Sequence, residues 1–258
     1  EVRDLFRGVS LPVKASVNAE HAASRPKFLQ TSLVNQERGV RYAADTGPDS
    51  FLQAEMRKYY RLVAALDIGM GKILAALEKH GVQDNTIIIF TSDHGHFLGE
   101  HGFDGKWLLY EESIHIPLII ADPRQPIKGR TSDALVTLLD MAPTMLAMGD
   151  VTIPASMQGR SVLPLLADPA APFRESFFME HLYRHGAAPP TRIEPSEGIR
   201  TLDWKYINYV DRAGALSEEL YRLTDDPLEM KNLSQDPEHA AQLKRMREQW
   251  QQMRVELK

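Results

Sequence analysis

The sequence predicts an α/β layer fold followed by a small α+β subdomain. In the first two thirds of the chain, helical patterns alternate with buried-strand patterns, as in a mixed sheet flanked by helices. After about residue 165, proline-rich connectors lead into short strand-like segments and one terminal helix. We therefore expect residues 1–165 to form part of an α/β domain and residues 166–258 to form the subdomain, an antiparallel sheet with a terminal helix.

The α/β part opens with a loop region and one long helix. Residues 1–50 contain turn residues without a sustained period, so loops are expected there. Residues 51–80 carry apolar side chains at steps of three and four, from Leu62 to Leu77, which predicts an amphipathic helix. Gly81 suits the position after the helix, where the backbone often turns left-handed.

Strands are expected after this helix. Residues 86–91 and 116–121 are continuous apolar runs rich in β-branched residues, which predicts strands covered on both faces. A third strand is expected at residues 133–139. Asp140 is then predicted to cap a short helix that Gly149 ends.

The subdomain is predicted to hold four short strands and one helix. The helix follows from an apolar stripe at steps of three and four, formed by Leu243, Met246, Trp250, Met253 and Leu257. The strand-like segments are residues 176–181, 198–201, 204–210 and 219–223.

Composition excludes several classes of function. The 258 residues are 43% hydrophobic and 25% charged, which is ordinary for a globular protein. A net charge of −5 argues against a nucleic-acid-binding surface. No apolar run is long enough to span a membrane. The absence of cysteine excludes disulfides, thiolate chemistry and cysteine-type zinc sites within this chain.

The loop at residues 92–106 carries the strongest chemical signal. Asp93 and His94 directly follow the first predicted strand, and loops at the carboxyl ends of strands commonly hold ligand sites in α/β sheets. A carboxylate and an imidazole can share a divalent cation, and Lys106 suits a tetrahedral oxyanion. Two alternatives are a plain turn, since Asp and Gly favour turns, and a zinc site of His94, His96 and His101.

The segment TSDHGHFLGEHGFDGKWLLYEESIHIPLII (residues 91–120) resembles the second signature region of the sulfatases, in the alkaline-phosphatase superfamily. Similar landmarks follow in the family's order: LLDMAPTMLAMGD (138–150), GRSVLPLL (159–166), GIRTLDWKYI (198–207) and ELYRLTDDPLEMKNLS (219–234). The resemblance covers nearly the whole chain. It implies an alkaline-phosphatase-like mixed sheet flanked by helices and a periplasmic or secreted location.

The resemblance also implies roles for single residues. Asp93 and His94 match ligands of the active-site cation, which is usually calcium, and Lys106 matches the catalytic lysine that contacts the sulfate group. His101 and His115 are predicted as further substrate contacts. For His115, pairing within a short helix is an equal alternative to lining the pocket.

Some parts of the family pattern are missing from this chain. Sulfatases carry a Cys- or Ser-x-Pro-x-Arg motif, whose Cys or Ser becomes formylglycine, the nucleophile, together with further upstream metal ligands. The nearest match here is Ser10-Leu-Pro-Val-Lys14, which has lysine in place of arginine and lies too close to Asp93, so we interpret it as a loop. We therefore expect this chain to be the C-terminal half of a sulfatase, inactive without its N-terminal half.

The predicted function is hydrolysis of a sulfate ester by the full-length protein, of the arylsulfatase or carbohydrate sulfatase kind. The expected partners are a sulfated small molecule or sulfated sugar and the missing N-terminal half. One alternative is a phosphodiesterase or phosphonate monoester hydrolase of the same superfamily, because metal and lysine suit either anion. Another is a non-catalytic fragment or binding module. A last group lies on the subdomain, and one or two of its members are expected to bind the sugar, the alternative being a solvated strand edge. This group comprises Glu180, His181, His185, Glu197 and Arg200.

Overall fold

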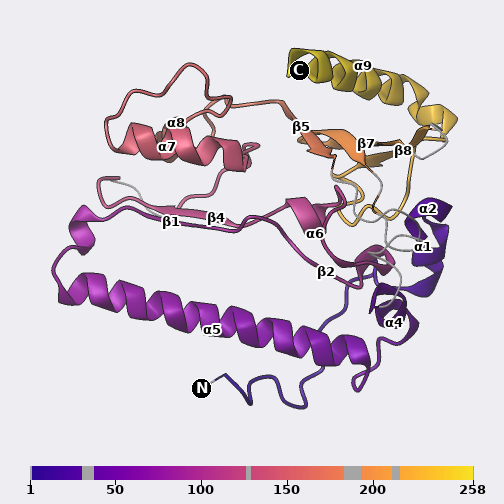
Figure 1. Ribbon diagram of the computed structural model, residues 1–258, viewed down its shortest axis with the longest axis horizontal. Helices are drawn as coiled ribbons and strands as arrows, with labels where there is room; N and C mark the ends of the chain where they lie inside the picture. The colour runs from indigo at the N-terminus through magenta and orange to yellow at the C-terminus, as the bar shows by residue number, and fades with distance from the viewer. Residues whose placement is uncertain are drawn as a thin grey trace.

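The computed structural model describes residues 2–30, 38–125, 129–182, 193, 195–210 and 216–257. Figure 1 shows the long helix α5 (Phe51–Lys79) along one side of the pair β1 (Ile88–Thr91) and β4 (Leu118–Ala121). The helices α7 (Met141–Met148) and α8 (Leu163–Ala167) lie on the other side of this pair (Figure 1). This arrangement confirms the predicted mixed α/β fold.

Helix α5 confirms the prediction for residues 51–80 and also shows a difference. The Ser50 hydroxyl accepts a hydrogen bond from the Gln53 amide at the start of the helix, and Gly81 has a φ of +64° just after it. Its first turns are buried, but further along the helix Leu62 is 70% exposed and Ile73 is 55% exposed. The described residues therefore leave most of the predicted apolar stripe uncovered.

Residues 2–18 and 45–50 are loops and turns, as the sequence predicts, but short helices occupy part of the region between them, and there the prediction is wrong. They are α1 (Ala19–Ser24), α2 (Lys27–Gln30) and α4 (Arg38–Ala44). Leu29 and Tyr42 on two of these helices are almost fully buried. Helices this short are stabilised by tertiary burial and not by their own sequence. They also span too few residues to show a periodic pattern, so the sequence does not predict them.

The strands β1 and β4 pair in antiparallel fashion, with Ile88 opposite Ala121 and Thr91 opposite Leu118. They exist where the sequence predicts them, but the expectation that both faces are covered is wrong. Ile119 is 61% exposed, and Thr91 and Ala121 are exposed as well. One face of the pair is covered, because Leu118 and Ile120 pack with Ile89 against a cluster of α7 and α8 residues, but the face that carries Ile119 and Ala121 is not.

The strand predicted at residues 133–139 is absent from the structure. Residues 131–137 have no regular secondary structure, and Leu138–Asp140 forms the 3₁₀ helix η3. Asp140 does not cap α7 with its side chain, contrary to prediction. Its carboxylate instead accepts a hydrogen bond from the Thr137 amide (2.7 Å) and is ion-paired with Arg174, and both contacts favour a turn here.

Smaller elements connect β1 to β4 and surround the loop of interest. They are β2 (Phe97–Leu98), η2 (Glu100–Gly102), β3 (Asp104–Gly105) and α6 (Glu111–Ile114), while η1 (Gln83–Asn85) precedes β1.

The subdomain contains the predicted antiparallel sheet and terminal helix. Its strands β5 (Ser176–His181), β6 (Ser196–Thr201), β7 (Trp204–Val210) and β8 (Leu216–Arg222) pair in that order. The 3₁₀ helix η4 (Pro237–His239) leads into α9 (Ala240–Glu256), which covers the outer face. The predicted stripe is confirmed at Leu243, Met246 and Trp250, which are buried.

The inner face of this sheet packs against the segment between β3 and α6. Leu108, Leu109 and Tyr110 share one buried cluster with Met179 and Ile207 of the sheet. At Gly198, an added Cβ would lie 3.4 Å from a Leu109 methyl and 2.6 Å from the Tyr206 carbonyl oxygen, so only glycine fits this close approach.

The division of the chain into two parts at residue 165 stays a prediction. No helix among the described residues has the length and apolarity to cross a membrane.

Candidate functional site

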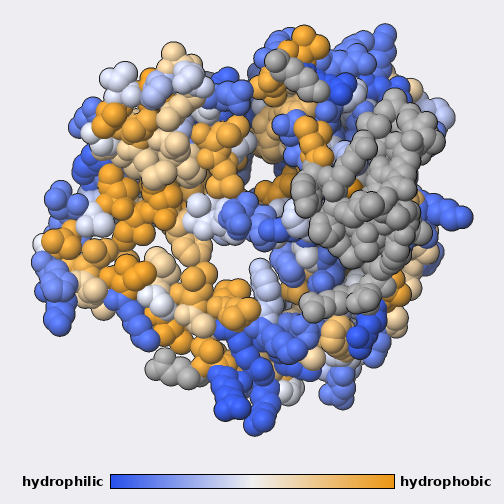
Figure 2. Space-filling model, in the orientation of Figure 1, coloured by the Kyte–Doolittle hydropathy of each residue, from blue (hydrophilic) through white to orange (hydrophobic). Residues whose placement is uncertain are grey.

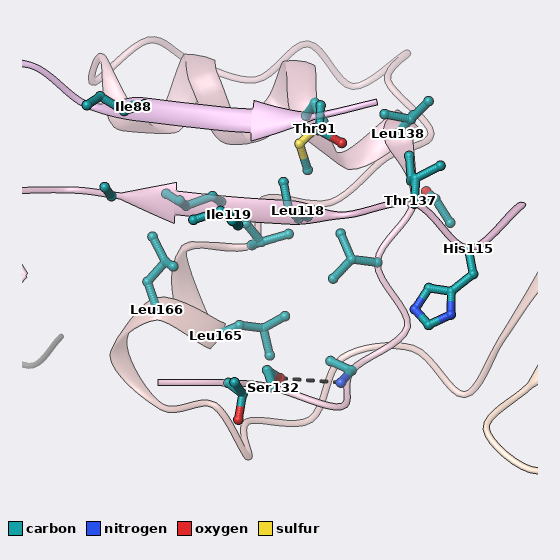
Figure 3. Close-up of a pocket in the computed structure, with 18 of the residues that line it drawn as sticks. Ile88, Thr91, His115, Leu118, Ile119, Ser132, Thr137, Leu138, Leu165 and Leu166 are labelled. Atoms are coloured by element: carbon teal, nitrogen blue, oxygen red, sulfur yellow. Dashed lines mark hydrogen bonds between the residues drawn. The ribbon is translucent and has the colours of Figure 1, made fainter. Parts of the chain in front are cut away.

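A large cavity of about 1980 Å³ lies beside β4. Figure 3 shows its apolar part, with Leu118 of β4 facing Leu165 of α8, and His115 beyond the strand ends. In Figure 2, hydrophobic side chains gather on the same part of the molecule, around hollows in this face. Polar side chains line the other end of the cavity, and they include Asp93, His94, Lys106, Glu111 and His181.

The structure brings Asp93, His94 and Lys106 together at this polar end. The Lys106 Nζ atom lies 2.5 Å from the His94 Nε2 atom. The Asp93 Oδ2 atom lies 3.5 Å from the same nitrogen, and its side chain is 82% exposed. Since Asp93 and His94 follow β1 directly, the end of that strand positions both.

The hydrogen bonds of His94 indicate which nitrogen can serve as a ligand. Its Nδ1 atom lies 2.7 Å from the carbonyl oxygen of Gly95, which can only accept, so Nδ1 carries the hydrogen. The Nε2 atom faces the Lys106 ammonium, which can only donate, and it therefore presents a lone pair. In this structure the Lys106 ammonium occupies that lone pair, so the nitrogen could join the Asp93 carboxylate as a ligand of a divalent cation only once Lys106 turns away.

Gly95 fixes the loop that carries these ligands. Its amide donates to the Ser113 carbonyl oxygen of α6 at 2.8 Å. A Cβ atom at this position would lie 1.9 Å from the Glu112 carbonyl oxygen. The loop can therefore approach α6 this closely only with glycine at position 95.

His115 lies at the same cavity but points largely to solvent. Its side chain is 78% exposed, and its Nδ1 atom is 3.6 Å from the Glu111 carboxylate, one helical turn away. Both alternatives from the sequence are thus met: His115 lines the cavity and also pairs within α6.

The structure does not bring His101 into the group of Asp93, His94 and Lys106. Its side chain is fully buried and stacks on Tyr110 with a centroid distance of 4.4 Å. Its Nδ1 atom is 3.0 Å from His21 Nε2, and its Nε2 atom is 3.2 Å from the Glu112 carboxylate. His101 therefore occupies an internal network behind α6.

This network shifts the pKa values of its members. Burial raises the pKa of Glu112, but His101 and Lys14 outweigh burial and lower it to about 2. Burial and the nearby Arg25 guanidinium lower the pKa of His21 to about 3. At neutral pH Glu112 is therefore ionised and His21 is uncharged, and His101 lies between them in contact with both.

A second buried cluster adjoins it around Lys205. The Lys205 Nζ atom is fully buried, 2.7 Å from a Glu111 carboxylate oxygen and 2.8 Å from one of Glu229. His101, Glu112 and Glu229 lie close enough for a cation, since their ligand atoms are within 4.8 Å of one another. However, the Glu229 oxygens already bind Lys205 and the Glu111 amide, so this trio is part of an ion-pair network.

The candidates on the subdomain have different surroundings. Glu197 is ion-paired with Arg254 of α9, and Arg200 is ion-paired with Glu111. Glu180 and His181 line the cavity, with Glu180 exposed. His185 lies outside the described residues.

Sequence reasoning missed the buried polar residues that support the site. His21, Arg25, Lys205 and Glu229 belong to no local motif, and their partners lie far away in the chain, with Arg25 and Glu219 separated by 194 positions. Lys14, which we had assigned to a plain loop, is ion-paired with Glu100 and Glu112. Only the tertiary fold brings these groups together.

Comparisons with known proteins show the family of this chain. The family model described as sulfatase matches residues 14–151. A second model, described as N-sulphoglucosamine sulphohydrolase, C-terminal, matches residues 99–256. This chain belongs to the sulfatase family. It corresponds to the C-terminal part of the family pattern, as the sequence predicted.

Two sulfatases illustrate the similarity in sequence. An N-acetylglucosamine-6-O-sulfatase of Bacteroides thetaiotaomicron is 38% identical over 197 residues, which cover 75% of this chain and 34% of that protein. Human arylsulfatase K is 34% identical over 185 residues, which cover 68% of this chain and 33% of that protein. The sulfatase chain thus spans about a third of the length of these curated relatives.

Solved structures support the alkaline-phosphatase-like fold. One was determined in complex with its substrate D-glucosamine-2-N,6-O-disulfate, and it is 36% identical, with a TM-score of 0.72 over 79% of this chain and 41% of that one. A phosphonate monoester hydrolase from Silicibacter pomeroyi is 25% identical, with a TM-score of 0.83 over 99% of this chain and 52% of that one.

Proposed function

We propose that the full-length protein hydrolyses a sulfate ester of a sugar. The observation that carries this proposal is the meeting of Lys106, His94 and Asp93 at the polar end of a large cavity. Similarity to an N-acetylglucosamine-6-O-sulfatase and to a structure solved with a sulfated glucosamine supports a sugar ester.

In this proposal Lys106 binds the sulfate group. Its ammonium is a compact positive charge that can donate to several sulfuryl oxygens. Negative charge on these oxygens grows in the transition state, so Lys106 contributes to turnover as well as to binding. His115, at the rim of the same cavity, is placed to contact the substrate from the solvent side.

Asp93 and His94 would hold a divalent cation, as is general for sulfatases, through the carboxylate and the Nε2 lone pair. A cation there would supply a Lewis acid beside the sulfate. Calcium takes six to eight oxygen ligands, so Asp93 and His94 would supply only part of its shell. We assign the other ligands and the formylglycine nucleophile to the N-terminal half.

The exposed stripe of α5 supports this division of the protein. Leu62, Leu66 and Ile73 are each more than half exposed, and contiguous apolar surface of this kind is commonly an interface. We infer that the N-terminal half covers it. The chain alone contains no Cys- or Ser-x-Pro-x-Arg segment, so we expect it to be inactive by itself.

Phosphonate monoester hydrolysis is the second candidate. It is favoured by the fold similarity to the Silicibacter pomeroyi hydrolase over 99% of the chain. The Lys106 ammonium and a cation suit a phosphonate as well as a sulfate.

Direct assay of the full-length protein separates the two candidates. N-acetylglucosamine 6-sulfate and a phosphonate monoester are offered to it under the same conditions, with calcium present. We expect the sulfate ester to be the better substrate by kcat/KM. Turnover of the phosphonate with none of the sulfate ester would refute the proposed function and support the second candidate.

A further inference from the structure

The contact between Lys106 and His94 places two tasks of the proposed function on one atom. The Lys106 Nζ atom lies 2.5 Å from the His94 Nε2 atom, and this nitrogen is also the one proposed to bind a cation. The accepting nitrogen of a neutral imidazole has a single lone pair. The Lys106 ammonium and a divalent cation therefore cannot use it at the same time.

The other nitrogen of His94 fixes the orientation of the ring. Nδ1 donates to the Gly95 carbonyl oxygen at 2.7 Å, and the Gly95 amide is itself bonded to the Ser113 carbonyl oxygen of α6. A flipped ring would lose the bond to Gly95 and would present carbon where Nε2 now lies. For a cation to reach the lone pair, Lys106 has to move, and not His94.

The backbone around Lys106 is held in place, so this movement falls to the side chain. Gly105 pairs with Phe97 in the β2–β3 ladder and has a φ of +87°. Trp107 has a φ of +90°, which is costly for an aromatic residue and persists only where the surrounding structure enforces it. Between these two residues, Lys106 carries the flexible four-carbon stem of a lysine.

Trp107 offers the ammonium a second partner. The Lys106 Nζ atom lies 5.2 Å from the centroid of the indole ring, within the range at which an aromatic face attracts a cation. Trp107 is 38% exposed and lines the same cavity. The ammonium can therefore leave His94 and remain beside a favourable surface.

We propose that the Lys106 ammonium occupies the place of the cation at His94 and that a divalent cation displaces it. The Asp93 Oδ2 atom lies 3.5 Å from the His94 Nε2 atom, so a positive charge beside this nitrogen also has a carboxylate nearby. This inference rests on the proposed function, which assigns a cation to Asp93 and His94.

The displacement links the binding of the cation to the binding of the anion. A cation that takes the Nε2 lone pair releases Lys106, whose ammonium can then donate all of its hydrogens to the anion. By thermodynamic reciprocity, an anion that draws Lys106 away from His94 strengthens cation binding by the same factor.

A double-mutant cycle on calcium binding by the full-length protein tests this competition. Isothermal titration with calcium alone, after removal of metal with a chelator, compares the wild type, Lys106→Met, His94→Phe and the double variant. We expect Lys106→Met to raise the calcium affinity about 10-fold or more where His94 is present, the scale of removing a hydrogen bond from a charged donor. In the His94→Phe background it should change the affinity less than about threefold, because no lone pair is left to release.

Inorganic sulfate supplies the second measurement. Its addition should raise the calcium affinity more in the wild type than in Lys106→Met, because only the wild type has an ammonium that sulfate can draw away from His94. An equal effect in the two proteins would leave only the direct attraction between the ions and would contradict the linkage.

The matched control is Lys244→Met, at a lysine whose side chain is 77% exposed, and it should bind calcium as the wild type does. Equal gains from Lys106→Met in both backgrounds would reveal plain charge repulsion and overturn this inference alone, as would no gain in either. A wild type that binds no calcium would instead overturn the cation site of the proposed function and, with it, this inference.

Discussion

At the scale of single residues, Lys106 is the side chain on which the proposed chemistry depends most. We expect Lys106→Ala in the full-length protein to lower kcat/KM for the sulfate ester on the order of 10²-fold, the scale of losing one electrostatic stabiliser. Lys106→Arg should recover only part of this loss, because a planar fork replaces a compact charge beside His94.

Steady-state kinetics checks this prediction, with Lys244→Ala as the control. Lys244 is an exposed lysine on α9, with 77% of its side chain accessible, and its loss should leave kcat/KM unchanged. Wild-type kinetics in a folded Lys106→Ala protein would remove Lys106 from the site.

His21 should make the protein sensitive to acid. Burial, followed by Arg25, lowers its pKa from 6.5 to about 3 in the folded state. Between these two values the unfolded chain binds a proton that the folded protein does not. The free energy of unfolding must therefore fall as the pH falls from about 6.5 towards 3.

Denaturant unfolding at pH 7, 6 and 5 measures this dependence. We expect His21→Gln to be less stable at pH 7 but to lose less stability on acidification than the wild type. His80→Gln, at an exposed histidine, should follow the wild-type curve. Parallel curves for the wild type and His21→Gln would show that His21 is not the group that titrates.

At the scale of elements, the contact between the 92–96 loop and α6 determines where the cation ligands lie. We expect Gly95→Ala to push this loop away, because the new Cβ would lie 1.9 Å from the Glu112 carbonyl oxygen. A displacement of about 1 Å at a reacting group can cost on the order of 10²-fold in rate. We therefore expect a loss of that size in kcat/KM, together with a lower melting temperature.

The control for this prediction is the same substitution in a helix. Gly69 lies inside α5, where an added Cβ meets nothing within 4 Å. In this chain by itself, Gly69→Ala should raise the free energy of unfolding by about 0.5–1 kcal/mol, since alanine favours a helix more than glycine does. If Gly95→Ala were as stable as Gly69→Ala in this chain, the loop would not depend on this close approach.

At the scale of the whole molecule, Lys205 joins the subdomain to the site. It extends from β7 to Glu111 of α6 and to Glu229, and it is fully buried. We expect Lys205→Met to lower the free energy of unfolding by about 3–5 kcal/mol, because two buried carboxylates lose their common counter-charge. Lys231→Met, at a lysine whose side chain is 75% exposed, should change it little.

Denaturant unfolding of the two variants checks this prediction at pH 7. Equal stabilities of Lys205→Met and Lys231→Met would mean that the buried cluster does not hold the two parts together. A lower free energy of unfolding in Lys205→Met but not in Lys231→Met would show that the Lys205 ammonium group couples the sheet to α6.

The sequence by itself determined the long helix α5, the segments β1 and β4, and the subdomain sheet with α9. In each of these, local periodicity or an apolar run agrees with the final environment closely enough to predict the element. It also determined the sulfatase family and the neighbouring positions of Asp93 and His94, because a motif is a local property of the chain.

Tertiary structure alone decided how these pieces are covered and which polar groups meet. The apolar run at 133–139 does not pair as a strand, because Asp140 and Arg174 stabilise a turn there. His101 sits in the same loop as His94 but is buried with His21, while Lys106 reaches His94. Burial and contacts between distant residues depend on the packing of the whole chain, and no local pattern encodes them.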